Sequence, residues 1–150
     1  MQSNSGELDR VIRDDVQAVL RGLGCDAVEV KSAIRRGTLH VVLIIHRKSG
    51  VDTDVCADVY RTIYPRLEML YPGKDVHLEV SSPGIGRTLK SVEEFGIFKG
   101  LGVKLLLDEE TDWKKGTIVD STEESVDIRF DSTIETIQYA VIRKAKLDNL

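Results

Sequence analysis

The 150-residue chain has few of the residues on which several classes of protein depend. It has two cysteines, Cys25 and Cys56, and no CxxC pair, so no disulfide framework can be assigned and a reducing compartment is expected. Its longest apolar run, residues 41–45, is far too short to cross a bilayer. The first ten residues lack the basic and apolar segments of a signal peptide. These absences predict a cytoplasmic protein with no membrane partner.

The chain also lacks an excess of positive charge. It has 21 Lys and Arg against 25 Asp and Glu, a net charge of -4 and an isoelectric point near 5.4. Binding nucleic acid through its phosphates requires a basic surface. Any RNA contact must therefore use local clusters, or the main partner is a basic protein. Aromatic residues make up only 5% of the chain, which is few for stacking on bases.

Motifs of common catalytic and cofactor sites are absent as well. The sequence contains no GxSxG, no P-loop and no HExxH. His40, His46 and His77 have no set of Cys, Asp or Glu at metal-ligand spacing. The glycines at positions 84 and 86 lack the third glycine of a dinucleotide site. The sequence therefore predicts a binding protein that is not an enzyme and holds no cofactor or metal.

Hydrophobic periodicity organises the first 80 residues as α-β-β-α-β. After a loose tail at 1–6, apolar residues recur at helical spacing from Leu8 to Leu23, and glycines at 22 and 24 end this helix. Strands are predicted around 28–30 and at 39–46, joined by a turn at Arg35-Arg36-Gly37, and a third strand at 76–80. Between them a second helix begins near residue 52, and Pro65 is expected to kink it or to end it at Tyr64. We expect one three-stranded sheet with two helices on it.

The spacing of apolar residues along the chain changes after Pro83. A short helix is predicted from Ser91, which would cap it, with Glu94 reaching back to the cap. Four short strands follow at 103–107, 117–120, 126–130 and 134–139, and residues 141–147 form either a final strand or a helical turn. Short strands at this spacing indicate a small β-barrel. The sequence thus predicts an α+β protein with an N-terminal domain at 1–82, a linker at 83–90 and a C-terminal domain at 91–150.

Three segments carry a resemblance to a known family. LEVSSPGIGR at 78–87 is similar to the central motif of the bacterial ribosome maturation factor RimP family, in which Ser-Ser-Pro-Gly is followed three residues later by Arg. VDTDVCADVYRTI at 51–63 resembles the second helix of that family, and ETIQYAVIRKAKL at 135–147 resembles its last strands. The chain departs from the pattern at Gly86, where the family usually has an acid, and at Thr88, where it often has Pro.

The resemblance implies a fold and a role. The family has an N-terminal α/β domain and a C-terminal Sm-like (SH3-like) barrel, no catalytic activity and no cofactor. Its members bind the free or immature small ribosomal subunit, which includes ribosomal RNA and a small-subunit protein beside the decoding centre. We therefore expect a monomeric, non-catalytic factor for maturation of the small (30S) subunit. The alternative is a general RNA-binding module of the Sm-like type.

Three kinds of residue are candidate partner-binding sites. In the central loop, Ser82, Pro83, Gly84 and Arg87 offer an open backbone and a guanidinium suited to phosphate or carboxylate. The alternative is an interdomain hinge, in which Arg87 caps a strand or pairs with an acid.

Basic and aromatic residues are the second kind of candidate. Arg35 and Arg36 lie at a hairpin tip, and Lys114 and Lys115 follow Trp113, an anchor of the type common in interfaces. The alternative is ordinary surface charge of mixed sign for the basic residues, and a core position for Trp113. Acidic loops at 108–112 and 123–124 suit a basic protein partner or are simply solvated turns.

Overall fold

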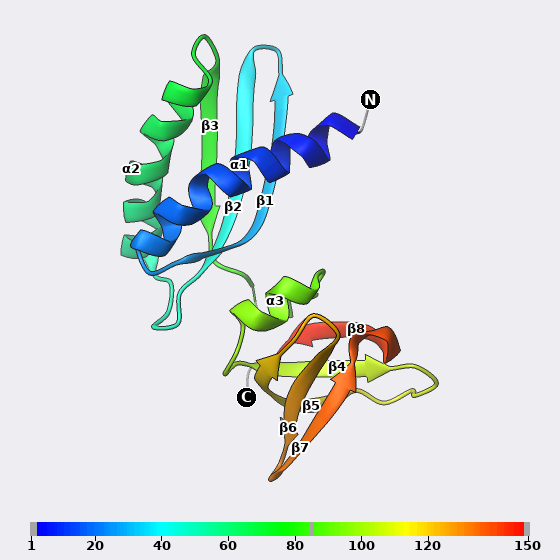
Figure 1. The fold of residues 1–150 in the computed structure, drawn as a ribbon. Coiled ribbons are helices and arrows are strands. Elements are labelled where there is room, and N and C mark those ends of the chain that lie inside the picture. The colour runs from blue at the N-terminus through cyan, green and yellow to red at the C-terminus, as the bar shows by residue number, and fades with distance from the viewer. Residues whose placement is uncertain (1–2, 85, 149–150) are drawn as a thin grey trace. The chain divides into compact units, whose positions relative to one another are not determined.

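The computed structural model of the chain describes residues 3–84 and 86–148. The chain divides into two compact units, Met1–Pro83 and Gly84–Leu150 (Figure 1). Each unit has its own sheet, and the fold as a whole is α+β, as the sequence predicts. No helix in the described part of the chain has the length and apolar character needed to cross a bilayer.

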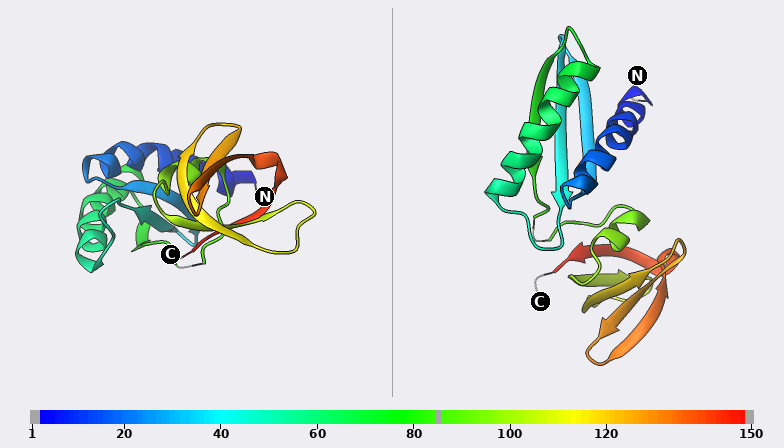
Figure 2. Two further views of the ribbon diagram at one scale, coloured as in Figure 1. Left: turned by 90° about the horizontal axis from the view of Figure 1, so that it is seen from below. Right: turned by 60° about the vertical axis from the view of Figure 1, so that its left-hand side comes forward.

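The first unit follows the predicted order. It consists of α1 (Ser3–Gly22), β1 (Asp26–Arg35), β2 (Thr38–His46), α2 (Thr53–Leu70) and β3 (Asp75–Ser81). The sheet order is β1-β2-β3, with β1 antiparallel and β3 parallel to the central β2. Both helices lie on the same face of this sheet (Figures 1 and 2). The three-stranded sheet with two helices is therefore confirmed.

The core of this unit forms between the sheet and the two helices. Side chains of β2 alternate, so that Leu39, Val41, Leu43 and Ile45 are fully buried while their neighbours are partly exposed. The helices contribute Ile12, Val16 and Leu20 from α1, and Val55, Val59, Ile63 and Leu67 from α2. Burial of these apolar stripes stabilises the unit more than local helix propensity does.

Two boundaries in this unit differ from the sequence prediction. Helix α2 continues through Pro65 to Leu70, so the alternative that it ends at Tyr64 is wrong, while a kink at Pro65 stays a prediction. The lost hydrogen bond is outweighed because Ile63 and Leu67, on either side of Pro65, are both fully buried. Helix α1 begins at Ser3, so most of the expected tail is helical, and residues 1–2 lie outside the described residues.

The second unit contains a short helix and an antiparallel sheet. Its elements are α3 (Val92–Ile97), β4 (Gly102–Leu107), β5 (Lys114–Ser121), β6 (Ser125–Phe130), β7 (Thr133–Gln138), a 3-10 turn at Tyr139–Val141, and β8 (Ile142–Leu147). The order in the sheet is β7-β6-β5-β4-β8. The predicted short helix and strands are present, and the tail is a strand. Closure of this five-stranded sheet into a barrel stays a prediction.

Candidate partner-binding surfaces

The central loop joins the end of β3 to the second unit. Ser82 and Gly84 are exposed and Pro83 is partly exposed, while Ile85 lies outside the described residues. The backbone after the loop pairs with β8: the Gly86 N–H donates to the Leu147 carbonyl at 3.2 Å, and the Leu147 N–H donates to the Arg87 carbonyl at 2.9 Å. The predicted contact residues Ser82, Pro83 and Gly84 therefore precede a segment that is held along β8.

The side chain of Arg87 is buried in an ion pair. Its Nε donates to Oε1 of Glu94 at 3.0 Å, and only 9% of the Arg87 side chain and 4% of the Glu94 side chain are exposed. The other carboxylate oxygen, Oε2, accepts from the Lys90 N–H at 3.2 Å. This placement favours the structural alternative for Arg87, in which it pairs with an acid. Contact of Arg87 with a partner stays a prediction.

The same ion pair explains why the expected capping box is wrong. Ser91 is at the N-cap of α3, but its side chain makes no capping hydrogen bond, and Glu94 reaches the Lys90 N–H instead of the Ser91 N–H. The Glu94 carboxylate binds the N–H group one residue before the expected one because its other oxygen accepts a hydrogen bond from Arg87. A buried charged pair outweighs a local capping preference.

Trp113 lies beside lysines that are distant in the sequence. The Nζ atoms of Lys104 and Lys146 are 5.3 Å and 5.7 Å from the centroid of its ring, which is within the range of a cation–π interaction. Across the sheet, Lys104 on β4 is the direct partner of Lys115 on β5 and of Lys146 on β8. Three lysines are therefore in register across three adjacent strands, and Trp113 packs against two of them.

The predicted pair Lys114-Lys115 does not act as one cluster. Lys114 is in register with buried Leu105, and its Nζ lies 4.7 Å from the Phe130 ring centroid. Because successive side chains of a strand point to opposite faces, Lys114 and Lys115 serve different faces of the sheet. The sequence analysis missed Lys104 and Lys146. In the sequence, Lys104 and Lys146 each stand between apolar residues, which indicates that they lie on the outer face of a strand. Only the strand register shows that the two lysines are neighbours.

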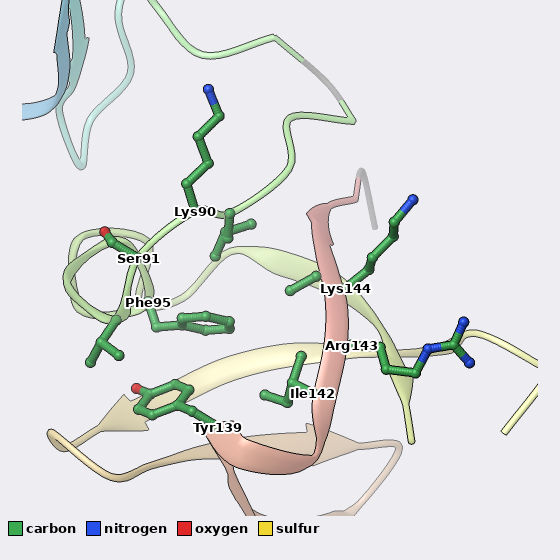
Figure 3. A pocket seen from close by; sticks show the side chains of 10 residues that line it. Lys90, Ser91, Phe95, Tyr139, Ile142, Arg143 and Lys144 are labelled. Carbon is green, nitrogen blue, oxygen red and sulfur yellow. The ribbon is translucent and has the colours of Figure 1, made fainter. Parts of the chain in front are cut away.

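A small pocket lies between α3 and the start of β8 (Figure 3). It has a volume of about 170 Å³, and Figure 3 shows the Phe95 and Tyr139 rings turned toward it beside Ile142. The two ring centroids are 5.1 Å apart, and burial raises the pKa of the Tyr139 hydroxyl. The charged ends of Arg143 and Lys144 point away from the rings. The pocket has an aromatic wall and a basic rim, and its volume leaves room for one side chain.

The hairpin tip of the first unit is built as predicted. Arg35 pairs with Thr38, which leaves a two-residue turn at Arg36 and Gly37. Their φ angles are 53° and 79°, the left-handed values that such a tight turn requires. Both Arg35 and Arg36 are exposed, so their guanidinium groups are accessible to a partner.

Other basic residues of the first unit are engaged within the protein. Arg66 forms two hydrogen bonds to Asp15, at 2.8 Å and 3.0 Å, and joins α2 to α1. Arg61 pairs with Asp58 one helical turn away. The interaction with Asp15 raises the pKa of Arg66. These arginines are balanced by acids of the same unit.

The titratable residues form no candidate metal centre within residues 3–84 and 86–148. Burial raises the pKa of both thiols, Cys25 and Cys56, which disfavours the reactive thiolate. The rings of His40 and His77 lie 5.5 Å apart on neighbouring strands.

Similarity to known proteins converges on one family. The family described as "RimP N-terminal domain" matches residues 15–86. A protein of Borrelia hermsii (strain HS1 / DAH), named "Ribosome maturation factor RimP", is 30% identical over 132 residues, which is 88% of this chain and 90% of that protein. Proteins with the same name are 28% identical over 145 residues in Borrelia recurrentis (strain A1) and 32% identical over 127 residues in Borreliella burgdorferi (strain ZS7). The Borrelia recurrentis alignment covers 97% of this chain and 96% of that protein, and the Borreliella burgdorferi one covers 83% and 85%.

Proposed function

The chain belongs to the RimP family of ribosome maturation factors, and we propose that it assists maturation of the small (30S) ribosomal subunit by binding immature or free subunits in the cytoplasm. The observation that carries this proposal is the extent of the similarity. An alignment over 97% of the chain includes both units, so the relationship is not confined to one domain.

We propose that the protein acts without catalysis. A binding factor shifts an assembly equilibrium only by binding one arrangement of RNA and protein more tightly than another. The pocket beside Phe95 is smaller than the roughly 300–1,000 Å³ typical of small-molecule sites, and a larger open hollow of about 460 Å³ beside Gly24 and Arg47 is lined by no acid, histidine or cysteine. The size of the pocket beside Phe95 suits a single side chain of a protein partner.

Two partners are proposed within the subunit: ribosomal RNA and the small-subunit protein beside the decoding centre. The loop at 108–112 is fully exposed and carries four acids, which suits a basic ribosomal protein. Exposed basic residues suit the phosphates of RNA. The proposed direct contacts are Ser82, Pro83, Gly84, Arg35, Arg36, Trp113 and Lys115. Arg87 stays a predicted contact although it pairs with Glu94, whereas Lys114 lies beside Phe130 on the other face of the sheet.

We further propose that the sheet of the second unit closes into an Sm-like barrel. Its two edge strands, β7 and β8, follow each other in the chain through the 3-10 turn at Tyr139–Val141. Closure would remove the exposed edges of an open sheet. The units Met1–Pro83 and Gly84–Leu150 would then correspond to the two domains of the protein, with the linker predicted at residues 83–90.

Sucrose-gradient sedimentation tests the assembly role. The purified protein is mixed with immature small subunits, mature small subunits and the complete ribosome, and its distribution across each gradient is measured. We expect co-migration with immature or free small subunits and little with the complete ribosome. Equal co-migration with every particle, or with none, would contradict the proposal.

A further inference from the structure

The three lysines that lie in register on β5, β4 and β8 form a row that local energetics do not favour. Lys115, Lys104 and Lys146 are direct cross-strand partners, and like charges placed directly opposite destabilise a sheet. Side chains on opposite positions of neighbouring strands lie roughly 5 Å apart, so the row concentrates three positive charges within about 10 Å. Such a conflict with local stability is expected where a surface has a function.

Trp113 turns this row into a composite surface. Its ring contacts Lys104 and Lys146 but remains partly exposed, so part of the indole is accessible. The cation–π contacts hold two flexible lysine side chains near defined positions, which reduces the conformational entropy lost when they bind a ligand. We call Lys104, Lys115, Lys146 and Trp113 the lysine–tryptophan face.

We propose that the lysine–tryptophan face binds single-stranded RNA, with phosphates at the three lysines and a base stacked on Trp113. Phosphates match the row because they are anions repeated along one strand. A base matches Trp113 because stacking on an aromatic ring tolerates any sequence. The Asp148 carboxylate, 3.9 Å from Lys115 Nζ, neutralises part of one charge and leaves the other two lysines to the ligand. This inference rests on the proposed function, in which the RNA is ribosomal.

The test uses the full-length protein and a labelled oligouridylate. Trp113 is the single tryptophan, so quenching of its fluorescence reports binding at this face, and anisotropy of the labelled RNA gives the affinity. Three phosphate contacts to a single strand predict a slope of about −2 for log affinity against log salt concentration. Trp113→Leu is expected to weaken binding, measured by anisotropy, by about tenfold.

Charge-neutral variants locate the site. The combined variant K104Q, K115Q and K146Q is expected to lose binding and most of the salt dependence, while K114Q keeps both. Lys114 is the matched control because it is the neighbour of Lys115 on the other face of the sheet. The combined variant removes like-charge repulsion, so it is expected to unfold in urea at the wild-type midpoint or above it.

Three outcomes would overturn the inference: equal RNA affinity of the wild type and the combined variant, an equal loss in K114Q, or competition by poly-glutamate as effective as that by RNA. The last would assign the face to an acidic protein. Sedimentation separates this inference from the assembly role. A wild-type protein that co-migrates with immature subunits without binding RNA through this face refutes only the inference. Specific RNA binding without co-migration refutes only the assembly role.

Discussion

Removing Arg87 should destabilise the second unit strongly. Arg87→Met keeps most of the side-chain length but leaves the Glu94 carboxylate buried without the guanidinium that faces it. Both side chains are at least 90% buried, so solvent does not screen the lost interaction appreciably. Removing one partner of a buried pair costs about 3–5 kcal/mol. A unit of this size has a total stability of roughly 3–10 kcal/mol, so the variant lies close to the limit of folding.

Urea unfolding followed by Trp113 fluorescence measures this effect, because the only tryptophan lies in the second unit. With a urea dependence of about 1 kcal/mol per M for a small domain, the midpoint should fall by about 3–5 M. If Arg87→Met is unfolded in the absence of urea, the double variant Arg87→Met/Glu94→Leu decides the question. Replacing both charges with apolar side chains is often neutral, so the double variant should recover most of the loss.

An exposed ion pair in the same unit provides the matched control. Lys99 Nζ lies 2.9 Å from the Asp120 carboxylate, a shorter distance than in the buried pair, but both side chains are more than half exposed. Surface pairs contribute little, so Lys99→Met should leave the midpoint nearly unchanged. If Arg87→Met shifted the midpoint no more than Lys99→Met does, burial would not be the source of the stability assigned to the Arg87–Glu94 pair.

Three further predictions follow from individual positions. A Cβ added at Gly116 would lie 2.6 Å from Cγ2 of Ile128, so Gly116→Ala should destabilise the second unit by about 1–3 kcal/mol in the same urea assay. Asp15→Asn should lower the melting temperature of the first unit, measured by circular dichroism, because it weakens both hydrogen bonds from Arg66. An unchanged melting temperature would show that this contact does not stabilise the packing of α1 against α2. Burial lowers the pKa of His46 from 6.5, so below about pH 6.5 the unfolded chain binds more protons at this residue than the folded chain does. The free energy of unfolding should therefore decrease as the pH falls below about 6.5. An NMR titration midpoint of His46 at or above 6.5 would contradict this sign.

Periodicity in the sequence predicts most of the fold because the signals are local. The change from helical to alternating spacing, the glycine at position 22 and the Arg36-Gly37 turn each depend on a few neighbouring residues. The predicted alternative in which α2 ends at Tyr64 is wrong for the same reason, because it judges the effect of Pro65 from local signals alone. The cost of Pro65 is local, whereas the burial of Ile63 and Leu67 that compensates for it depends on a sheet formed by residues elsewhere in the chain.

The candidate site was less predictable because it depends on pairing between distant segments. Trp113 and Lys115 stand close together in the sequence, but Lys146 joins them only when β8 pairs with β4. The sequence left open whether Arg87 contacts a partner or pairs with an acid, and only the fold shows its guanidinium turned inward to Glu94. A single sequence records which charges exist, but strand register decides which of them share a face.

The second unit is acidic as a whole, but its acidic and basic residues lie in different places. Residues 81–150 have 10 Lys and Arg against 13 Asp and Glu, which argues against RNA binding if the charge is treated as uniform. Seven of those acids lie in the connections at 108–112, 123–124 and 131, whereas the lysine row lies on paired strands. At physiological ionic strength charges are screened beyond about 8 Å, so acids farther than this from the row act weakly on a phosphate bound there, while Asp148, 3.9 Å from Lys115, offsets part of one lysine charge. Local charge on a rigid sheet, and not net charge, therefore decides whether this unit can bind RNA and a basic protein at different surfaces.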